Sequence, residues 1–284
     1  MSNELENANV AEAAAAAPAQ PEGAPRIRVA AASHNGAVRA NNEDNYSING
    51  QYRQIDDLIV DFEDTLPADG LMLEVCDGMG GEAMGEVASE IAVKHTADLL
   101  VKLRQADEKD LINEINSYVD RANNEICETI GNTETRRGGS TFVLIYFKGD
   151  VVYPYSLGDS RIYAFNGTKL VQISEDHTLG MRKYKSNIIT FEEAMTGPDS
   201  HKLTLFLGVD IDNNGLTAQP YRPFRVERGW KLLLCSDGLY DMVSAVEIAE
   251  TLQLDTSEAC KRLVERAIAH GGIDNVTVIV AEMI

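Results

Sequence analysis

The stretch Leu71-Met72-Leu73-Glu74-Val75-Cys76-Asp77-Gly78-Met79-Gly80-Gly81 organises the rest of the chain. An apolar run ends in Asp77, glycines follow at once, and a helical pattern begins after them. The run predicts a buried strand and the glycines predict a turn. We therefore expect Asp77 at the carboxyl end of a strand, where its carboxylate and the Gly78 carbonyl can bind a hard cation. Taken alone, the stretch favours a solvated aspartate at a structural turn.

The same arrangement recurs along the chain, and this changes the interpretation. Three other aspartates flank apolar runs: Asp159 after Val151–Leu157, Asp237 after Lys231–Cys235 and Asp274 before residues 276–280. Carboxylates at strand ends of one sheet system can converge, and they then repel one another unless cations lie between them. One metal site explains the positions better than independent coincidences do.

Composition limits the classes of function. The chain has 284 residues, of which 45 are acidic and 25 basic, and its formal net charge is −20. The length suits one large domain or two small ones, and a hydrophobic content of 44% is ordinary for a protein with a core. The negative charge argues against a nucleic acid or an anionic membrane as partner.

The cysteines and the N-terminus bear on location. The four cysteines are widely spaced without a CxxC pair, which favours buried free thiols over a zinc site. No apolar run reaches membrane-spanning length, and the acidic N-terminus does not resemble a signal peptide. We therefore expect a cytoplasmic protein.

Hydrophobic periodicity predicts one domain after a tail. Residues 1–25, rich in alanine, proline and acids, predict a disordered tail, and residues 26–284 predict the folded domain. Within it we expect amphipathic helices at 84–103, 111–130, 246–252 and 257–270, and strand hairpins around 148–150 and 166–168. Residues 50–70 are expected to be irregular, and residues 178–203 to form an inserted flap. Strands in hairpins and helices in pairs favour an α+β fold of two packed antiparallel sheets with helix pairs outside.

Six short motifs follow one another in a recognisable order. They are Arg39 with Asn42-Glu43-Asp44, Asp77-Gly78-Met79-Gly80-Gly81, Gly138-Gly139-Ser140-Thr141, Gly158-Asp159-Ser160-Arg161, Ser236-Asp237-Gly238 with Asp241, and Asp274-Asn275. On these motifs the domain resembles the metal-dependent serine/threonine protein phosphatases of type 2C, the PPM family, in its bacterial branch. The resemblance implies a four-layer αββα sandwich with a metal cleft at one end.

The resemblance also implies a set of site residues. Asp77 bridges two Mn²⁺ or Mg²⁺ ions, with Glu43 and the Gly78 carbonyl completing one site and Asp237 and Asp274 the other. Further members of the set are Arg39, which binds the substrate phosphate, Asp159 and Asp241, which hold a weaker third ion, and Asp44 and Asn275, which support the ligands from behind, Asp44 through water.

The chain departs from the family pattern at two positions. Met79 stands where animal members have a histidine, so that position supplies no general acid. Leu205 replaces an arginine usual in the segment 201–208, which bears on how the flap is anchored. Of the other candidates, we expect His34 and His177 to make structural hydrogen bonds and Arg161 to form an ion pair on the sheet surface.

The chemistry of phosphomonoester hydrolysis agrees with these expectations. Two metals about 3.5–4 Å apart can share a hydroxide and clamp the phosphoryl oxygens. Oxygen ligands favour Mg²⁺ or Mn²⁺ over Zn²⁺, and an arginine offers the fork that a phosphate dianion prefers. We therefore expect a hydrolase of signalling pathways that dephosphorylates phosphoserine and phosphothreonine in substrates of Ser/Thr kinases. The alternatives are a catalytically silent phosphoprotein-binding scaffold of the same fold and a phosphatase for small phosphoesters.

Overall fold

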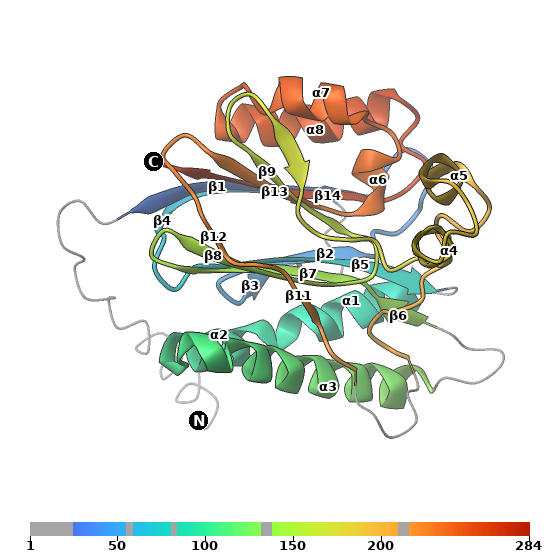
Figure 1. The fold of residues 1–284 in the computed structure, drawn as a ribbon, viewed down its shortest axis with the longest axis horizontal. Coiled ribbons are helices and arrows are strands. Elements are labelled where there is room, and N and C mark those ends of the chain that lie inside the picture. Colours follow the sequence, from blue (N-terminus) through green and yellow to red (C-terminus); the bar gives the residue numbers. More distant parts are fainter. Residues whose placement is uncertain (1–24, 55–58, 81–83, 132–137, 210–215) are drawn as a thin grey trace, which may run out of the picture.

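The computed structural model describes residues 25–54, 59–80, 84–131, 138–209 and 216–284. The predicted tail lies outside this part of the chain except for its last residue, Pro25. The described residues form four layers, in which two antiparallel sheets face each other and helices cover their outer faces (Figure 1). This is the predicted αββα sandwich.

The two sheets collect strands from all parts of the chain. The first sheet has the order β10-β9-β13-β14-β1-β4, with β1 Arg26–His34, β4 Ile59–Pro67, β9 Arg161–Phe165, β10 Leu170–Gln172, β13 Lys231–Cys235 and β14 Val276–Met283. The second has the order β11-β8-β7-β5-β2-β3, with β2 Asp44–Ile48, β3 Gln51–Tyr52, β5 Met72–Gly80, β7 Phe142–Lys148, β8 Val151–Leu157 and β11 Gln219–Pro220. Two short strands join it at the side, β6 Gly138–Ser140 on β5 and β12 Phe224–Arg225 on β8.

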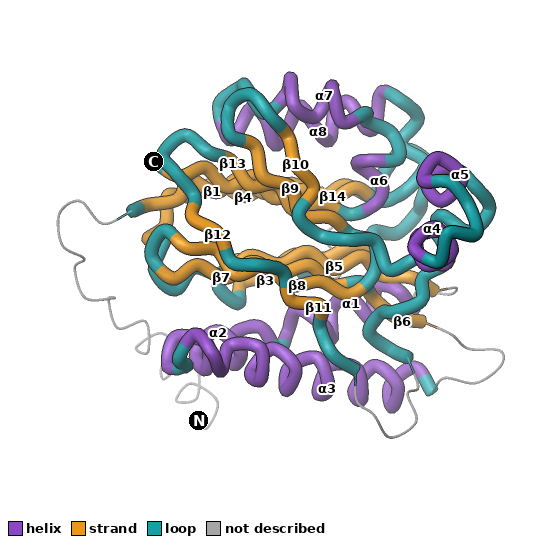
Figure 2. The backbone as a smooth tube through the Cα atoms, viewed as in Figure 1, coloured by secondary structure: helices purple, strands orange, loops and turns teal. Residues whose placement is uncertain are grey.

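The helices fall into three groups (Figure 2). The second sheet is covered by α1 Met84–Lys94, α2 Thr96–Gln105 and α3 Leu111–Ile130, with the 3₁₀ turn η1 Glu108–Asp110 before α3. The first sheet is covered by α6 Asp237–Tyr240, α7 Ala245–Thr251 and α8 Thr256–Ala269. The short helices α4 Leu179–Lys185 and α5 Phe191–Thr196 lie in the segment predicted to form a flap, beside β6 and α6 at one end of the sandwich. None of the described helices is long and apolar enough to cross a bilayer.

The alternation of side chains in β5 explains the layers. Leu73 and Val75 lie in the core between the sheets, whereas Met72 and Cys76 lie in the core under α1 and α3. Successive residues of a strand point to opposite faces, so both faces of β5 are buried. Asp77 continues the row of Leu73 and Val75 and therefore emerges between the two sheets, at the end where their apolar core stops.

Three expectations about secondary structure were wrong. The strand around Asp77 does not turn there, because β5 runs on to Gly80 and pairs with β6. Residues 59–67 are a strand along the edge of the first sheet, paired with β1 throughout. The predicted helix 84–103 is two helices separated at His95, where the Thr96 hydroxyl donates to the Val93 carbonyl.

Candidate metal centre

Asp44 and Asp77 are brought face to face by strand pairing. Asp44 at the start of β2 is the register partner of Asp77 in β5. The backbone around Asp77 is fixed by Thr141, whose amide donates to the Asp77 carbonyl (2.8 Å) and whose hydroxyl accepts from the Asp77 amide (2.9 Å). Gly78 is required here, because a Cβ at this position would lie 2.1 Å from the Gly85 carbonyl oxygen and 2.4 Å from that of Glu43. The start of α1 and the Glu43 backbone therefore close directly onto β5.

Asp237 and Asp241 lie one turn apart on α6. Asp237 is the first residue of this helix and Asp241 caps its other end, so both carboxylates project from the same side. The helix packs closely against the chain before β14, since a Cβ on Gly238 would lie 1.9 Å from the Asn275 carbonyl oxygen. The motif Ser236-Asp237-Gly238 thus combines a strand end, an acidic residue and a contact that only glycine allows.

Asn275 ties the loop that carries Arg39 and Glu43 to the strand that follows Asp274. Its side-chain oxygen accepts from the Glu43 amide (2.8 Å), and its side-chain nitrogen donates to the carbonyls of Asn35 (3.0 Å) and Asn41 (2.8 Å). Arg39 reaches across to donate to Asp274 Oδ2 (2.7 Å). The buried Asn275 therefore fixes three of the predicted site residues relative to one another.

The charges of these residues act on one another. Burial and the negative charges of Asp44, Asp237 and Asp159 raise the pKa of Asp77 well above its ordinary value. Burial, followed by Asp159 and Asp241, does the same to the pKa of Asp237. A proton or a cation bound between such carboxylates reduces the repulsion between their negative charges.

The pKa values of the other carboxylates at this end, Glu43, Asp159 and Asp44, are raised as well. Burial raises the pKa of Glu43 to about 7, against the opposing charge of Arg39, and raises that of Asp159 to about 7, with Asp176 adding to the effect. The pKa of Asp44 rises to about 6 because of burial, although the Ser236 hydroxyl lowers it in part. The whole end of the sandwich therefore carries more negative charge than it can stabilise alone.

The residues fit divalent cations. The converging donors are carboxylate oxygens, which suit hard ions such as Mg²⁺ and Mn²⁺. Behind them, Asp44 accepts from the Ser236 hydroxyl with Oδ2 (2.7 Å), but its Oδ1 is buried and has no hydrogen-bond partner. A buried carboxylate oxygen without a donor indicates a place for an ordered water or an ion.

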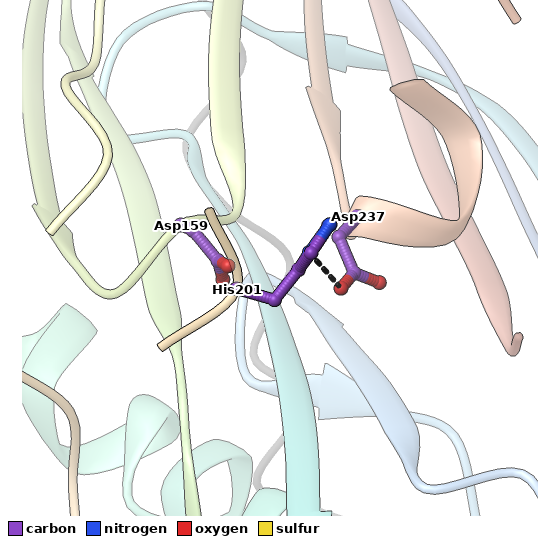
Figure 3. Close-up of side chains that lie close together, drawn as sticks. All are labelled: Asp159, His201 and Asp237. Atoms are coloured by element: carbon purple, nitrogen blue, oxygen red, sulfur yellow. Dashed lines mark ion pairs between the residues drawn. The ribbon is translucent and has the colours of Figure 1, made fainter. Parts of the chain in front are cut away.

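The distances between the predicted ligand atoms differ across the site. Ligand atoms of Asp159, His201 and Asp237 all lie within 4.8 Å of one another (Figure 3), and in the described chain no other group of histidine, cysteine and acidic side chains meets this limit. Glu43, Asp77 and Asp274 lie outside this group, and Asp274 is paired with Arg39 instead.

His201 and its surroundings were not foreseen as part of the site. The histidine lies in the loop after α5 and reaches the carboxylates only through the fold, so no spacing in the sequence signals it. Arg161 was placed wrongly: it is buried, forks onto Asp176 (3.0 and 2.6 Å) and stacks 3.5 Å above the Tyr240 ring. Arg161 is the first residue of β9, and its side chain packs against Tyr240 of α6 inside the protein instead of lying on the sheet surface.

The two histidines expected to be structural accept backbone hydrogen bonds. His34 Nδ1 accepts from the Gly36 amide (2.9 Å), and His177 Nδ1 accepts from the Gly158 amide (3.1 Å). The second of these contacts holds the turn that precedes Asp159. Burial lowers the pKa of His177, which agrees with a neutral ring in this position.

Comparison with known proteins places these features in context. The family model described as protein phosphatase 2C matches residues 56–270. The serine/threonine protein phosphatase PstP of Mycobacterium tuberculosis is 34% identical over 263 residues, which cover 91% of this chain and 45% of PstP. The protein phosphatase PhpP of Streptococcus pneumoniae is 34% identical over 75% of this chain and 85% of its own length. This chain therefore spans about half the length of PstP and most of PhpP.

Solved structures have the same architecture. The crystal structure of the catalytic domain of PstP in complex with two manganese ions superposes with a TM-score of 0.69 at 32% identity, and covers 92% of this chain and 99% of that domain. Another crystal structure of the M. tuberculosis phosphatase gives a TM-score of 0.71 at 32% identity, over 90% of this chain and 98% of the other.

Proposed function

Since this chain belongs to the protein phosphatase 2C family, we propose that it is a metal-dependent phosphatase that hydrolyses phosphoserine and phosphothreonine in proteins. Relatives named as serine/threonine phosphatases support the substrate class, and the PstP structure with manganese supports the kind of cofactor. The observation that carries the proposal is the convergence of Asp77, Asp159 and Asp237 at one end of the sandwich, where burial and the charge of Asp159 raise the pKa of both Asp77 and Asp237.

Two Mn²⁺ or Mg²⁺ ions are proposed to bind at this end. Asp77 would bind both, Glu43 and the Gly78 carbonyl would complete one site, and Asp237 and Asp274 the other. Such ions, when bound, activate water as a nucleophile and neutralise the phosphoryl oxygens. Glycine at position 78 lets the backbone next to Asp77 pack directly against the carbonyls of Gly85 and Glu43, and the strand pairing of Asp44 with Asp77 keeps the proposed shared ligand in register.

Arg39 is proposed to bind the phosphate of the substrate. Its side chain is half-exposed at the rim of the site and its Nη2 donates to Asp274 Oδ2 (2.7 Å). A guanidinium presents several donors in one plane, so it can bind a phosphate dianion bidentately. Because Arg39 borders Asp274, it would orient a phosphoryl group next to the proposed metal ligands.

Asp44 and Asn275 are proposed to position the groups that contact metal or substrate. Asn275 fixes the backbone of Glu43 and the loop of Arg39 through its three hydrogen bonds. Asp44, held by the Ser236 hydroxyl, keeps one oxygen free for a water molecule next to Asp77. Neither side chain is needed in the chemistry itself.

The proposal extends to the setting in which the enzyme acts. We infer a role in cytoplasmic signalling, in which the phosphatase reverses the action of Ser/Thr kinases on shared protein substrates. The strongly negative chain, with its net charge of −20, disfavours nucleic acids and anionic membranes as partners.

The test is phosphate release by metal-free protein after Mn²⁺ or Mg²⁺ is added. We expect no hydrolysis in excess chelator, and hydrolysis of phosphoserine and phosphothreonine peptides when either metal is restored. Turnover in verified absence of metal would contradict the proposed site. Binding of phosphopeptides without any release of phosphate would indicate a silent scaffold, and faster hydrolysis of small esters than of peptides would indicate a small-molecule phosphatase.

A further inference from the structure

We propose that Val38 and Ile273 form a specificity subsite that binds an apolar side chain of the substrate, within two residues of the phosphorylated serine or threonine. The inference rests on the proposed function, because it takes Arg39 to bind the phosphate and Asp274 to bind metal. It deepens that function by naming a feature of the substrate sequence. It also assigns a role to two residues that precede motifs without being part of them.

The two residues lie on neighbouring loops that are held together next to the metal centre. The Ala37 amide donates to the Gly272 carbonyl (2.8 Å), so Val38 and Ile273 each follow directly after a residue of this hydrogen bond. The next residue of each loop belongs to the arginine–aspartate ion pair at the rim of the site, which has a length of 2.7 Å. Val38 and Ile273 therefore lie between the point where the loops touch and the groups proposed to bind phosphate and metal.

Both side chains are exposed although they are large and apolar. Val38 is 67% exposed and Ile273 is 57% exposed. Neither side chain belongs to one of the three apolar cores of the described residues. Single exposed apolar residues are common on protein surfaces and need no explanation. A pair on two touching loops, one residue away from a phosphate ligand and a metal ligand, is placed to contact the substrate.

Hydrogen bonds fix the backbone of both loops. The Asn35 side chain donates to the Arg39 carbonyl (2.9 Å), and the Asn275 side chain donates to the Asn35 carbonyl (3.0 Å). On the other loop, the Gly272 amide donates to the Ala267 carbonyl (3.0 Å). The exposed pair thus belongs to a preformed surface, and a ligand that binds there orders little of the protein.

The position of the phosphate limits where the flanking residues of a bound peptide can lie. Successive Cα atoms of a chain are about 3.8 Å apart, so the two residues on either side of the phosphorylated one stay within about 8 Å of it. A phosphate bound by Arg39 brings one of these flanks to the loops. An apolar side chain on that flank would cover Val38 and Ile273 and remove apolar surface of both partners from water.

The other exposed apolar side chains provide a matched control. Among the described residues, four large ones lie in the segment 184–205 and three more lie on elements that supply no proposed ligand: Val101 on α2, Val171 on β10 and Val246 on α7. Val101 is 55% exposed, close to the value for Ile273. Its helix α2 lies at the opposite end of the molecule from α4 and α5 (Figure 1), so Val101 shares the exposure of the pair without its position.

The experiment compares phosphothreonine peptides that differ at one flanking position. Each peptide carries leucine or serine at the first or second position before or after the phosphothreonine, and kcat/KM is measured from phosphate release in Mn²⁺. In the wild type we expect leucine to raise kcat/KM on the order of fivefold at one of these positions, as partial burial of an aliphatic side chain should do. In the double variant Val38→Ser, Ile273→Ser we expect the leucine and serine peptides to react equally fast.

The ratio between the two peptides does not respond to a merely structural effect of the substitutions. A displaced Arg39 or a weakened metal site would slow both peptides of a pair, because both carry the same phosphorylated residue. The control variant Val101→Ser should keep the leucine preference of the wild type.

Three outcomes overturn the inference and leave the proposed function intact. They are equal kcat/KM for leucine and serine peptides at every position in the wild type, a leucine preference that the double variant retains, and a preference that Val101→Ser also loses. A protein that hydrolyses neither peptide of any pair in the presence of Mn²⁺ contradicts the proposed function, and the inference with it.

Discussion

The carboxylate of Asp77 is proposed to bind the catalytic metals, but its charge destabilises the fold of the metal-free protein. The side chain projects from β5 into the space where the two sheets end, and burial, together with the charges of Asp44, Asp237, Asp159 and Asp274, raises its pKa. A neutral group of the same shape would remove this repulsion and would also remove a ligand from both proposed metal sites. One substitution should therefore increase the stability of the metal-free protein and abolish its activity.

We predict that Asp77→Asn abolishes phosphopeptide hydrolysis and raises the free energy of unfolding of the chelated protein by about 1 kcal/mol or more. Urea denaturation in chelator gives the stability, and phosphate release in Mn²⁺ gives the activity. The control is Asp98→Asn, which removes an exposed carboxylate from α2 at 3.5 Å from Arg121 and should change neither quantity appreciably. Hydrolysis by Asp77→Asn at the wild-type rate would remove Asp77 from the metal centre.

The aspartates beside apolar runs could be placed from the sequence, whereas His201 and Arg161 could not. Asp159, Asp237 and Asp274 stand next to apolar strands, and Asp77 follows the apolar part of β5, so these apolar runs locate them approximately. His201 reaches its partners because α4 and α5 fold back toward α6, and neither helix encodes that approach in a periodic pattern. The partner of Arg161 is Asp176, in an irregular segment beyond the next hairpin, which explains why its burial was missed.

Within β5, Glu74 is a buried acid between the second sheet and its helices. Its Oε1 lies 2.6 Å from the Tyr118 hydroxyl, which is also 3.0 Å from the Ala92 carbonyl oxygen, and its Oε2 has no hydrogen-bond partner. The hydroxyl has one proton and can donate it to only one of these acceptors at full strength. A protonated Glu74 that donates to Tyr118, while Tyr118 donates to Ala92, satisfies both groups. Burial accordingly raises the pKa of Glu74 to about 8.

We predict that Glu74→Gln makes the protein more stable than the wild type at pH 8 but not at pH 4.5. The folded state retains a proton up to pH about 8, whereas the unfolded chain releases it near the ordinary glutamate pKa of 4.5. The free energy of unfolding therefore falls as the pH rises through this window, by at most about 1.4 kcal/mol per pH unit. Glutamine is neutral throughout and can donate to Tyr118, so the variant avoids this loss.

Urea denaturation at several pH values measures the effect, with Glu128→Gln on the exposed side of α3 as the control. The control should follow the pH dependence of the wild type. A stability difference between Glu74→Gln and the wild type that stays constant from pH 5 to pH 8 would show that Glu74 is ionised in the folded state throughout.

Helices and hairpins could be predicted because their signals are local, and the edge of the sheet could not. The helices from residue 111 and from residue 257 have a clear apolar face, and the β7–β8 and β9–β10 hairpins have turn residues between apolar strands. The strand β4 is rich in acids because it lies at the edge of the first sheet, where only Phe62 and Leu66 of its described side chains pack against the core. Its strand conformation comes from pairing with β1, a distant contact that the local sequence pattern of β4 does not indicate.

At the scale of the whole molecule, repulsion between carboxylates destabilises the fold at the acidic end of the sandwich. Three apolar cores fill the spaces between the four layers, and the carboxylates gather where the core between the sheets ends. Their repulsion acts between β2 and β5 of one sheet and α6 and the strand start at Asp274 beside the other. A cation bound there would therefore connect the two sheets, and its binding energy would add to the stability of the entire fold.

We predict that Mn²⁺ raises the melting temperature of the metal-free protein in proportion to the logarithm of its concentration once the site is saturated. Differential scanning calorimetry in chelator and at increasing Mn²⁺ measures the shift. Sodium chloride at the same ionic strength should give much less of it, because screening acts weakly on buried carboxylates. The shift should shrink in Asp237→Ala, which removes a ligand from α6 and with it the connection to the other sheet. An equal shift in the wild type and in Asp237→Ala would mean that the stabilising ion binds elsewhere on this acidic surface.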